Sequence, residues 1–81
     1  MLIQYEPANN RSAAYDGEHE IGECCYSPAA DTWTIYHTEV DPAYGGRGIA
    51  RKLVEAVNAA AEEAGVNIVS TCSYAKKVLG R

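Results

Sequence analysis

The clearest periodic pattern in the chain lies between residues 49 and 64. Apolar side chains recur there at intervals of three and four residues, and charged or amide side chains take most of the other positions. This spacing is typical of an α-helix that buries one face. Gly65 follows the last apolar position and is suited to end the helix in a left-handed conformation. We therefore predict one amphipathic helix over residues 49–64.

Segments rich in β-branched and aromatic residues indicate strands on both sides of this helix. The richest is Thr32–Val40, which we predict as the central strand, ended by Pro42. Asp16-Gly17 is a dipeptide favoured in two-residue hairpin turns, so it predicts a hairpin earlier in the chain. The other predicted elements are strands at about 2–6, 12–15, 19–26 and 66–71 and a short helix at 74–79.

The order of these elements predicts the fold class. Strand, helix and strand between residues 32 and 71 form a crossover, which makes the two flanking strands parallel and places the helix on one face of the sheet. The earlier strands are joined by short turns and form an antiparallel meander. We expect an α/β (α+β) fold in which about four antiparallel strands are continued by one parallel strand. The 81 residues fit a single domain, 1–81.

Charge and cysteine content exclude several function classes. Eleven acidic and seven basic residues give a net charge of −4, which disfavours nucleic acid and anionic membranes as partners. We find no secretory leader and no apolar run long enough to cross a bilayer, so we expect a cytoplasmic protein. The three cysteines lack the spacing of a metal site or a thioredoxin motif, so we expect reduced thiols and no metal.

The charges at the start of the predicted helix are reversed from the usual preference. Arg47, Arg51 and Lys52 lie at the positive end of the helix dipole, whereas Glu62 and Glu63 lie at the negative end. Cations at this position become favourable when an anion binds there, together with free backbone amides. The glycines before the helix would let those amides approach a phosphate closely.

A simpler interpretation of this segment is also open. Glycines at positions 45, 46 and 48 can serve only to make a tight turn from strand to helix, with the cations as a solvated face. The segment matches neither a Walker phosphate loop nor a dinucleotide-binding fingerprint. An unrelated α+β fold that binds some other phosphate is a weaker alternative.

The segment YGGRGIARKLVEAVNAAAEEAG, which follows a predicted strand, resembles the acyl-CoA-binding loop and helix of the GNAT superfamily of N-acetyltransferases. The signature of that superfamily is Q/R-x-x-G-x-G/A. Gly48 and Ala50 match it, whereas Gly45 stands where Gln or Arg is usual. HTEVDPAYGGRGIARKLV followed by CSYA resembles the very small GNAT-like proteins, and the resemblance covers about residues 15–79, including Gly22 and Tyr26.

The resemblance implies where acetyl-CoA would bind. The pantetheine arm would lie between the strands at 32–40 and 66–71, which splay apart, and the pyrophosphate would lie on the amides of residues 45–50. A cationic loop would then be explained by the diphosphate. The cofactor-binding candidates are Glu39, Val40, Gly45, Gly46, Arg47, Gly48, Ile49, Ala50 and Arg51.

Four residues are candidates for chemistry. Acetyl transfer to an amine needs a base and an acid, and by resemblance Tyr74 is placed for the acid that protonates the leaving thiolate. His37 and Glu39 are candidates for the base, and their spacing places them on one strand face with Trp33 and Ile35. Each also has a structural interpretation: Tyr74 as a packing residue, His37 as a hydrogen-bonded core residue and Glu39 as a solvated strand end.

The cysteines are interpreted separately. Cys72 lies where the two strands should part, so it could hold an acyl group or form a mixed disulfide with CoA. It could equally be a small buried thiol that fills space. Cys24 and Cys25 should point to opposite faces of their strand, and we assign them only packing roles.

The resemblance implies an N-acetyltransferase acting on a small-molecule or protein amine. The alternative is a non-catalytic CoA-binding or protein-interaction module on the same fold. The two differ in whether the four candidate side chains converge on the thioester or are scattered. A homodimer is compatible with so small a domain, although no segment identifies an interface.

Overall fold

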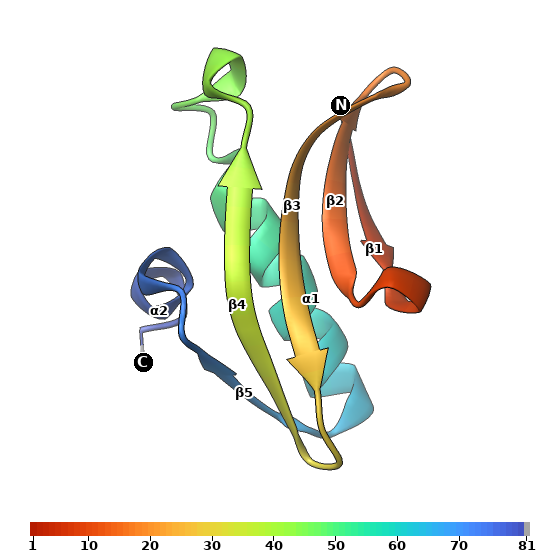
Figure 1. Ribbon diagram of the computed structural model, residues 1–81, viewed down its shortest axis with the longest axis vertical. Coiled ribbons are helices and arrows are strands. Elements are labelled where there is room, and N and C mark those ends of the chain that lie inside the picture. Colours follow the sequence, from red (N-terminus) through yellow and green to blue (C-terminus); the bar gives the residue numbers. More distant parts are fainter. Residues whose placement is uncertain (81) are drawn as a thin grey trace.

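The computed structural model describes residues 1–80, which form one five-stranded mixed sheet with two α-helices (Figure 1). Two short 3-10 turns, η1 and η2, follow β1 and β4. The elements are β1 Leu2–Glu6, η1 Pro7–Asn9, β2 Arg11–Asp16, β3 His19–Pro28, β4 Thr32–Val40, η2 Pro42–Tyr44, α1 Ile49–Ala64, β5 Asn67–Ser70 and α2 Ser73–Leu79.

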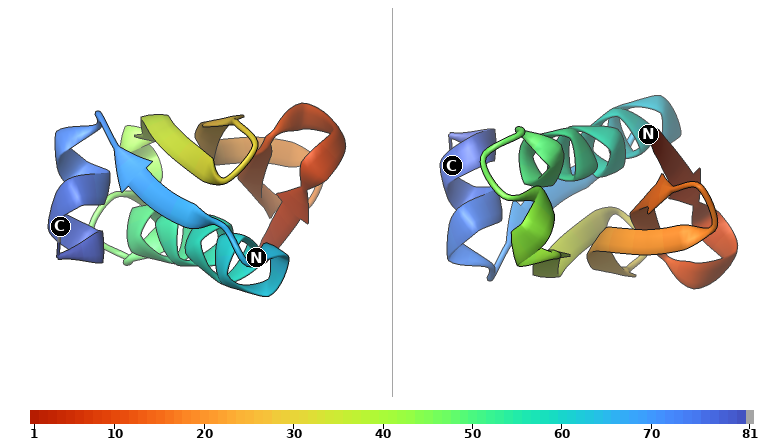
Figure 2. Two further views of the ribbon diagram at one scale, coloured as in Figure 1. Left: turned by 90° about the horizontal axis from the view of Figure 1, so that it is seen from below. Right: turned by 90° about the horizontal axis from the view of Figure 1, so that it is seen from above.

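The strands lie side by side in the order in which they follow along the chain. Neighbours from β1 to β4 are antiparallel, and β4 and β5 are parallel. Helix α1 connects β4 to β5 and covers one face of the sheet, the inner face (Figure 2). Within residues 1–80, no helix covers the opposite, outer face. The predicted fold is therefore confirmed: a four-stranded antiparallel meander continued by one parallel strand.

The core lies between α1 and the inner face. Leu53 and Val57 of α1 are fully buried there, and the buried hydroxyl of Ser12 donates to the carbonyl of Leu53 over 2.7 Å. Gly22 marks the closest approach of the layers, because a Cβ at this position would lie 2.9 Å from the Glu39 carbonyl oxygen and 3.2 Å from the Leu53 side chain. A larger residue at position 22 would push the helix or β4 away.

The predicted bounds of β1, β4 and α1 agree with the structure. Gly65 ends α1 with φ 74°, and its amide donates to the carbonyl of Glu62 over 3.1 Å, as expected for a left-handed cap. Among the described residues, neither helix is long and apolar enough to cross a membrane.

The first hairpin differs slightly from its prediction. Asp16 still pairs with His19, so the two-residue turn consists of Gly17 and Glu18 rather than Asp16 and Gly17. Gly17 has φ 63°, which accounts for a glycine at this position. The turn therefore presents the Asp16 side chain at the end of a strand, where it is available for a contact elsewhere.

Candidate functional site

Strands β4 and β5 are paired only along the first half of β4. The register joins Thr32 to Asn67 and Ile35 to Ser70, and the amide of Thr71 donates to the Ile35 carbonyl over 2.9 Å. Residues 36–40 form the open half of β4, in which residues 37–40 pair with β3 alone, and β5 leads away from them toward α2 (Figure 1). The edge of the open half thus offers main-chain groups to an extended ligand.

A β-bulge reverses the faces of the strand at the start of the open half. His37 and Ile35 pair with consecutive residues of β3, so Tyr36 is an extra residue in β4. Ile35 is buried in the core, whereas His37 and Glu39 approach each other on the outer face. The prediction that these two share a face with Trp33 and Ile35 is wrong, because strict alternation fails at a bulge.

The glycine loop, Gly45–Gly48, connects η2 to α1. Gly46 and Gly48 have φ values of 77° and 73°, a left-handed conformation that favours glycine. Gly48 is the N-cap of α1. Because glycine has no side chain, it offers no oxygen to accept hydrogen bonds from the backbone amides of the first turn. The amide of Lys52 donates to the Gly48 carbonyl over 3.2 Å. The helix amides before Lys52 have no intrahelical acceptor and are available to water or a ligand.

A cavity of about 250 Å³ lies over this loop. A Cβ added to Gly46 or Gly48 would meet no protein atom within 4 Å, so the space above the loop is open. The cavity brings together the end of the open half of β4, the loop, the start of α1 and one residue of α2. It is lined by Val40, Tyr44, Gly45, Gly46, Gly48, Ile49, Ala50 and Tyr74.

The loop cations differ in their surroundings. The guanidinium carbon of Arg47 lies 5.3 Å from the centroid of the Tyr44 ring, within the range of a cation–π contact. Arg51 lies 3.8 Å from a carboxylate oxygen of Glu55, one turn further along α1, and both side chains are exposed. Such an exposed pair contributes little, so Arg51 remains available to an anion. The first turn of α1 has no acidic residue.

Cys72 lies at the junction of β5 and α2, beside the open half of β4. Its Sγ is 3.7 Å from the Oγ1 atom of Thr38, and the Thr38 hydroxyl donates to the Sγ of the buried Cys24 over 3.6 Å. Thr38 therefore lies on the inner face, opposite to His37. The two thiols flank one hydroxyl at the place where β4 and β5 part.

The environment of Cys72 favours its thiolate. Partial burial acts to raise the pKa of Cys72, but the backbone groups of Ala75 and Tyr74 and the hydroxyl of Thr38 outweigh it, so the pKa lies below its ordinary value. By contrast, burial raises the pKa of Cys24 and of Cys25 to about 11. Cys72 is thus the thiol that most readily becomes a nucleophile.

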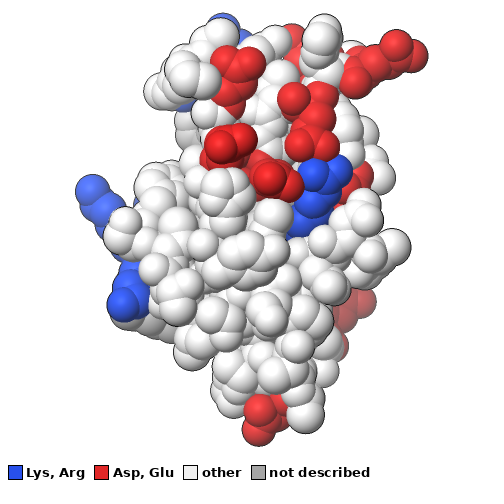
Figure 3. Space-filling model, viewed as in Figure 1, with Lys and Arg blue, Asp and Glu red and all other residues white. Residues whose placement is uncertain are grey.

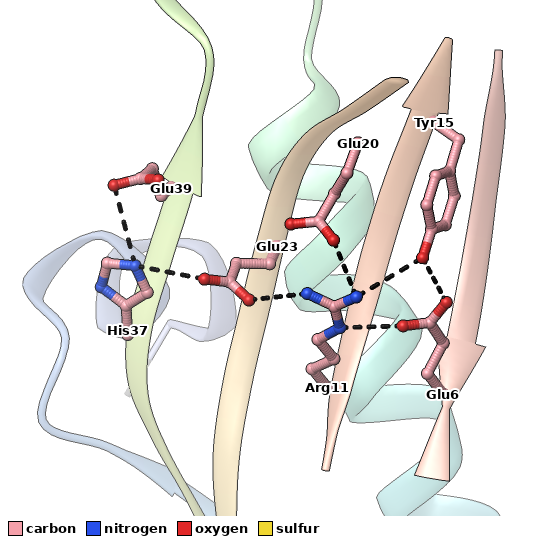
Figure 4. Close-up of polar contacts among 7 residues, drawn as sticks. All are labelled: Glu6, Arg11, Tyr15, Glu20, Glu23, His37 and Glu39. Atoms are coloured by element: carbon pink, nitrogen blue, oxygen red, sulfur yellow. Dashed lines mark hydrogen bonds and ion pairs between the residues drawn. The ribbon is translucent and has the colours of Figure 1, made fainter. Parts of the chain in front are cut away.

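A network of charged side chains covers part of the outer face (Figure 4). The Nε2 atom of His37 lies 3.8 Å from Glu23 and 3.9 Å from Glu39. Hydrogen bonding to Arg11 lowers the pKa of Glu23, which favours a carboxylate beside His37. Arg11 binds three carboxylates, those of Glu6, Glu20 and Glu23, at 2.8, 2.8 and 3.0 Å. Figure 3 shows acidic side chains gathered over the upper part of the same view.

Two larger hollows are less suited to an anion. One of about 470 Å³ opens on β3 and β4 and is lined by four carboxylate side chains, those of Glu20, Glu23, Glu39 and Asp41. The other, of about 490 Å³, lies near the end of α1 around Trp33 and Glu63. Negative charge in both linings opposes a phosphate. The cavity over the glycine loop, although smaller, is the one whose chemistry suits a diphosphate.

The structure divides the predicted site residues into two groups. Tyr74 and most of the cofactor-binding candidates line the cavity over the glycine loop. Cys72 is the N-cap of α2, two residues before Tyr74. His37 and Glu39 lie on the other side of β4. Sequence reasoning missed Thr38, because its face depends on the bulge, and Tyr44, although an aromatic residue directly before the glycines was a visible signal.

The comparisons with known proteins agree with this architecture. A family model described as GCN5-related N-acetyl-transferase matches residues 11–81. The chain is 31% identical to a GCN5-like protein from Staphylococcus aureus, whose solution structure it matches with a TM-score of 0.74. The match covers 98% of this chain and 78% of that protein. Among curated proteins, none matches the chain.

More distant structures share the fold alone. A GNAT-family protein from Desulfovibrio desulfuricans matches with a TM-score of 0.68 and 22% identity over 74% of this chain. An aminoglycoside acetyltransferase from an uncultured soil metagenomic sample, solved in complex with sisomicin, matches with a TM-score of 0.65 and 21% identity over 88% of this chain. The chain spans 41% of the first protein and 53% of the second.

Proposed function

Because the chain belongs to the GCN5-related N-acetyltransferase family, we propose that it binds acetyl-CoA at the glycine loop and transfers the acetyl group to an amine. Residues 1–81 would act as one acyl-CoA-binding domain. The observation that carries the proposal is the single cavity shared by Val40 of the open half of β4, the glycine loop and Tyr74 of α2. A strand edge, a set of amides and a phenol are thereby available to one ligand.

The diphosphate would be held at the glycine loop. Open space above Gly46 and Gly48, uncapped amides at the start of α1 and the absence of a nearby acidic residue in its first turn suit a multiply charged anion. Arg47 and Arg51 would add charge on the solvent side. The donors are mostly backbone groups, so the loss of the usual Gln or Arg at position 45 removes one side chain and leaves this set intact.

The pantetheine arm would lie along the open half of β4. Its amides need hydrogen-bond partners, and Val40 directs its main-chain groups to the edge that β5 does not cover. Those of Glu39, the other candidate from the sequence, face its β3 partner Glu23 instead, because the amide of Asp41 donates to Ile21 of β3 and the pairs alternate along the strands. A ligand in this position would complete the sheet as a missing strand does. Its acyl end would point toward the place where β5 turns away, beside Thr38 and Cys72.

Acetyl-CoA would supply an activated acetyl group as a thioester. Transfer to an amine requires one group that takes a proton from the ammonium and one that gives a proton to the departing sulfur. We assign the second role to the hydroxyl of Tyr74, a residue that lines the cavity. We assign the first to His37 on the outer face, whose Nε2 atom lies 3.8 Å from Glu23 and 3.9 Å from Glu39. A Glu39 carboxylate acting directly is the other option for the base.

Cys72 has a second chemical option. Its lowered pKa favours a thiolate, which would attack the thioester carbonyl and release the CoA thiolate, leaving an acetyl thioester on Cys72. Attack of an amine on that thioester would then transfer the acetyl group and regenerate the Cys72 thiol. The Cys72 thiol would carry the acetyl group between the two steps. Mass spectrometry of the intact protein after mixing with acetyl-CoA tests this option, because the Cys72→Ser variant would lose any added acetyl group.

A second candidate function is ligand binding without turnover. His37 and Glu39 lie on the face of β4 opposite to Thr38 and Cys72, so the candidate side chains do not form one tight cluster. This arrangement fits a CoA-binding module that has kept the cofactor cavity alone. Release of free CoA in the presence of a panel of amines, compared with acetyl-CoA alone, distinguishes the two functions.

Isothermal titration of the reduced protein with acetyl-CoA, ATP and inorganic pyrophosphate tests the cofactor site. We expect acetyl-CoA to bind in preference to ATP, and the Arg47→Glu variant to bind about tenfold more weakly, as expected for a lost charge-assisted contact. Lys77→Glu, an equal charge change at an exposed position of α2, serves as the control. Absence of binding at high micromolar acetyl-CoA would overturn the proposal.

A further inference from the structure

Tyr44 connects the glycine loop to a distant part of the chain. Its hydroxyl donates to the Oδ2 atom of Asp16 over 2.5 Å, across 28 positions of sequence. Asp16 is the last residue of β2 and lies at the mouth of the first hairpin. The Asp16 carboxylate, through this hydrogen bond, raises the pKa of Tyr44, so the phenol remains a protonated donor. The loop is thereby tied to the sheet by a side chain.

The ring of the same tyrosine supports the loop and its cation. Tyr44 is half-buried, packs against the core and lines the cavity beside Gly45 and Gly46. Its other contact is with Arg47, whose guanidinium carbon lies 5.3 Å from the ring centroid. A long, flexible arginine loses rotamer freedom when it binds, and a ring that already holds it reduces that cost. Tyr44 is therefore linked to a strand, a turn and a cation of the site.

The base of the loop is fixed by short-range bonds, whereas its glycines are not. The amides of Ala43 and Tyr44 bond to the side chain and the carbonyl of Asp41, at 2.9 Å each, and Gly45 donates to the Pro42 carbonyl over 3.1 Å. Gly46 and Gly48 have positive φ angles, and glycine adopts positive and negative φ about equally well, so the φ angles alone do not fix the conformation of these two residues. Support from outside the loop is needed to hold one conformation.

We propose that Tyr44, anchored by Asp16 and carrying Arg47 on its ring, is a positioning residue that holds the glycine loop and its cation ready for the diphosphate. The inference rests on the proposed function, because it names how that site is organised. In this chain glycine occupies position 45, where the signature has Gln or Arg, so Arg47 on Tyr44 supplies the loop cation in its place. A pre-formed site binds more tightly, since less order must be imposed on binding.

Titrations followed by NMR, with acetyl-CoA and with S-acetylpantetheine, separate positioning from mere structural support. S-acetylpantetheine keeps the thioester and the amides of the arm but lacks the diphosphate. Tyr44→Phe keeps the ring and removes the hydrogen bond to Asp16, and Asp16→Asn changes the bond from its other end. Tyr15→Phe is a matched control, because it removes another tyrosine–carboxylate bond, to Glu6, on the outer face.

We expect Tyr44→Phe and Asp16→Asn each to weaken acetyl-CoA binding about threefold to tenfold, the range for the net contribution of one typical hydrogen bond. Neither should change the dissociation constant for S-acetylpantetheine, and the control should change neither ligand. Unchanged acetyl-CoA binding in both variants, or an equal loss for both ligands, would overturn the inference and leave the proposed function standing. Wild-type protein that fails to bind acetyl-CoA would overturn both.

Discussion

Residues 33–35 of β4 pair with β3 on one side and β5 on the other, whereas residues 37–40, beyond the bulge at Tyr36, pair with β3 alone. In the first half, Ile35 is fully buried and Trp33 packs against the core. In the second half, Tyr36 is 57% exposed, and His37 and Glu39 belong to the outer-face network. The same strand therefore changes from a core element to an exposed edge within a few residues.

The comparison indicates how so small a chain could combine a stable core with the binding site that we propose. The paired half anchors β5, and thereby α2, to the rest of the sheet. The bulge at Tyr36 then turns the strand, and the pairing with β5 ends there. A ligand edge is created at little cost, because the core below it is complete. Changes in the first half should affect stability, and changes around the second half should affect binding.

The largest expected effect is on stability, from Ile35→Ala. The lost burial and the cavity left behind should reduce the free energy of unfolding by about 2–5 kcal/mol. Urea denaturation followed by circular dichroism measures it. Tyr36→Ala, one residue along but exposed, should change stability by less than about 1 kcal/mol. Comparable losses for the two variants would contradict the division of β4.

The next prediction compares glycine-to-alanine substitutions at the two ends of α1. Gly48→Ala and Gly65→Ala each place a Cβ on a residue with φ near 73° and 74°, which costs about 1–2 kcal/mol. Both variants should lose similar stability, but only Gly48→Ala should weaken acetyl-CoA binding, by about tenfold or more as the loop amides shift. Titration calorimetry at a temperature where both remain folded gives the result. Equal affinities would mean that the loop is not the binding element.

A smaller effect concerns the thiols beside the open half of β4. The lowered pKa of Cys72 predicts that alkylation by iodoacetamide begins at a lower pH for Cys72 than for an ordinary thiol, because the thiolate is the reactive form. Cys25, whose burial raises its pKa to about 11, should react only in strongly alkaline solution. Peptide mass spectrometry across a pH series measures both. A faster reaction of Cys25 at neutral pH would contradict this assignment.

The smallest expected effect is that of Thr38→Val on the pH dependence of Cys72 alkylation. It removes the hydroxyl that contacts Cys72 and contributes to its lowered pKa, so the alkylation profile of Cys72 should move to higher pH. Thr38→Ser, which keeps the hydroxyl, should restore the original profile. A profile that does not move in the valine variant would leave backbone groups, those of Ala75, Tyr74 and Thr38, as the cause of the lowered pKa.

Much of the fold followed from local patterns that act over a few residues. The 3.6-residue period of α1, the left-handed cap at Gly65 and the β-branched run of β4 each depend on neighbouring positions, and each agrees with the structure. The bulge at Tyr36 did not follow, because it depends on how β4 pairs with β3, and the sequence of β4 alone indicates no extra residue. The sequence therefore did not allow a prediction of the sheet face on which Thr38, His37 and Glu39 each lie.

The candidate site likewise has one part that local sequence patterns predict and one part that depends on contacts between distant segments. The glycine loop could be predicted, since positive φ, close backbone approach and reversed helix charges leave a signature in consecutive residues. The support of Tyr44 by Asp16 could not, because the two residues are joined only by the folding of the first hairpin toward η2. The outer-face network around Arg11 likewise draws residues from four strands, β1 to β4 (Figure 4).

The most direct test of the account is an NMR titration of uniformly 15N-labelled, reduced protein with acetyl-CoA, read amide by amide. We predict the largest chemical-shift changes at the glycine loop, at Ile49 and Ala50, and along residues 36–40, with much smaller changes at residues 32–35. Shifts confined to the other hollows, or spread equally over both halves of β4, would contradict the claim that the open half and the glycine loop form one acyl-CoA site.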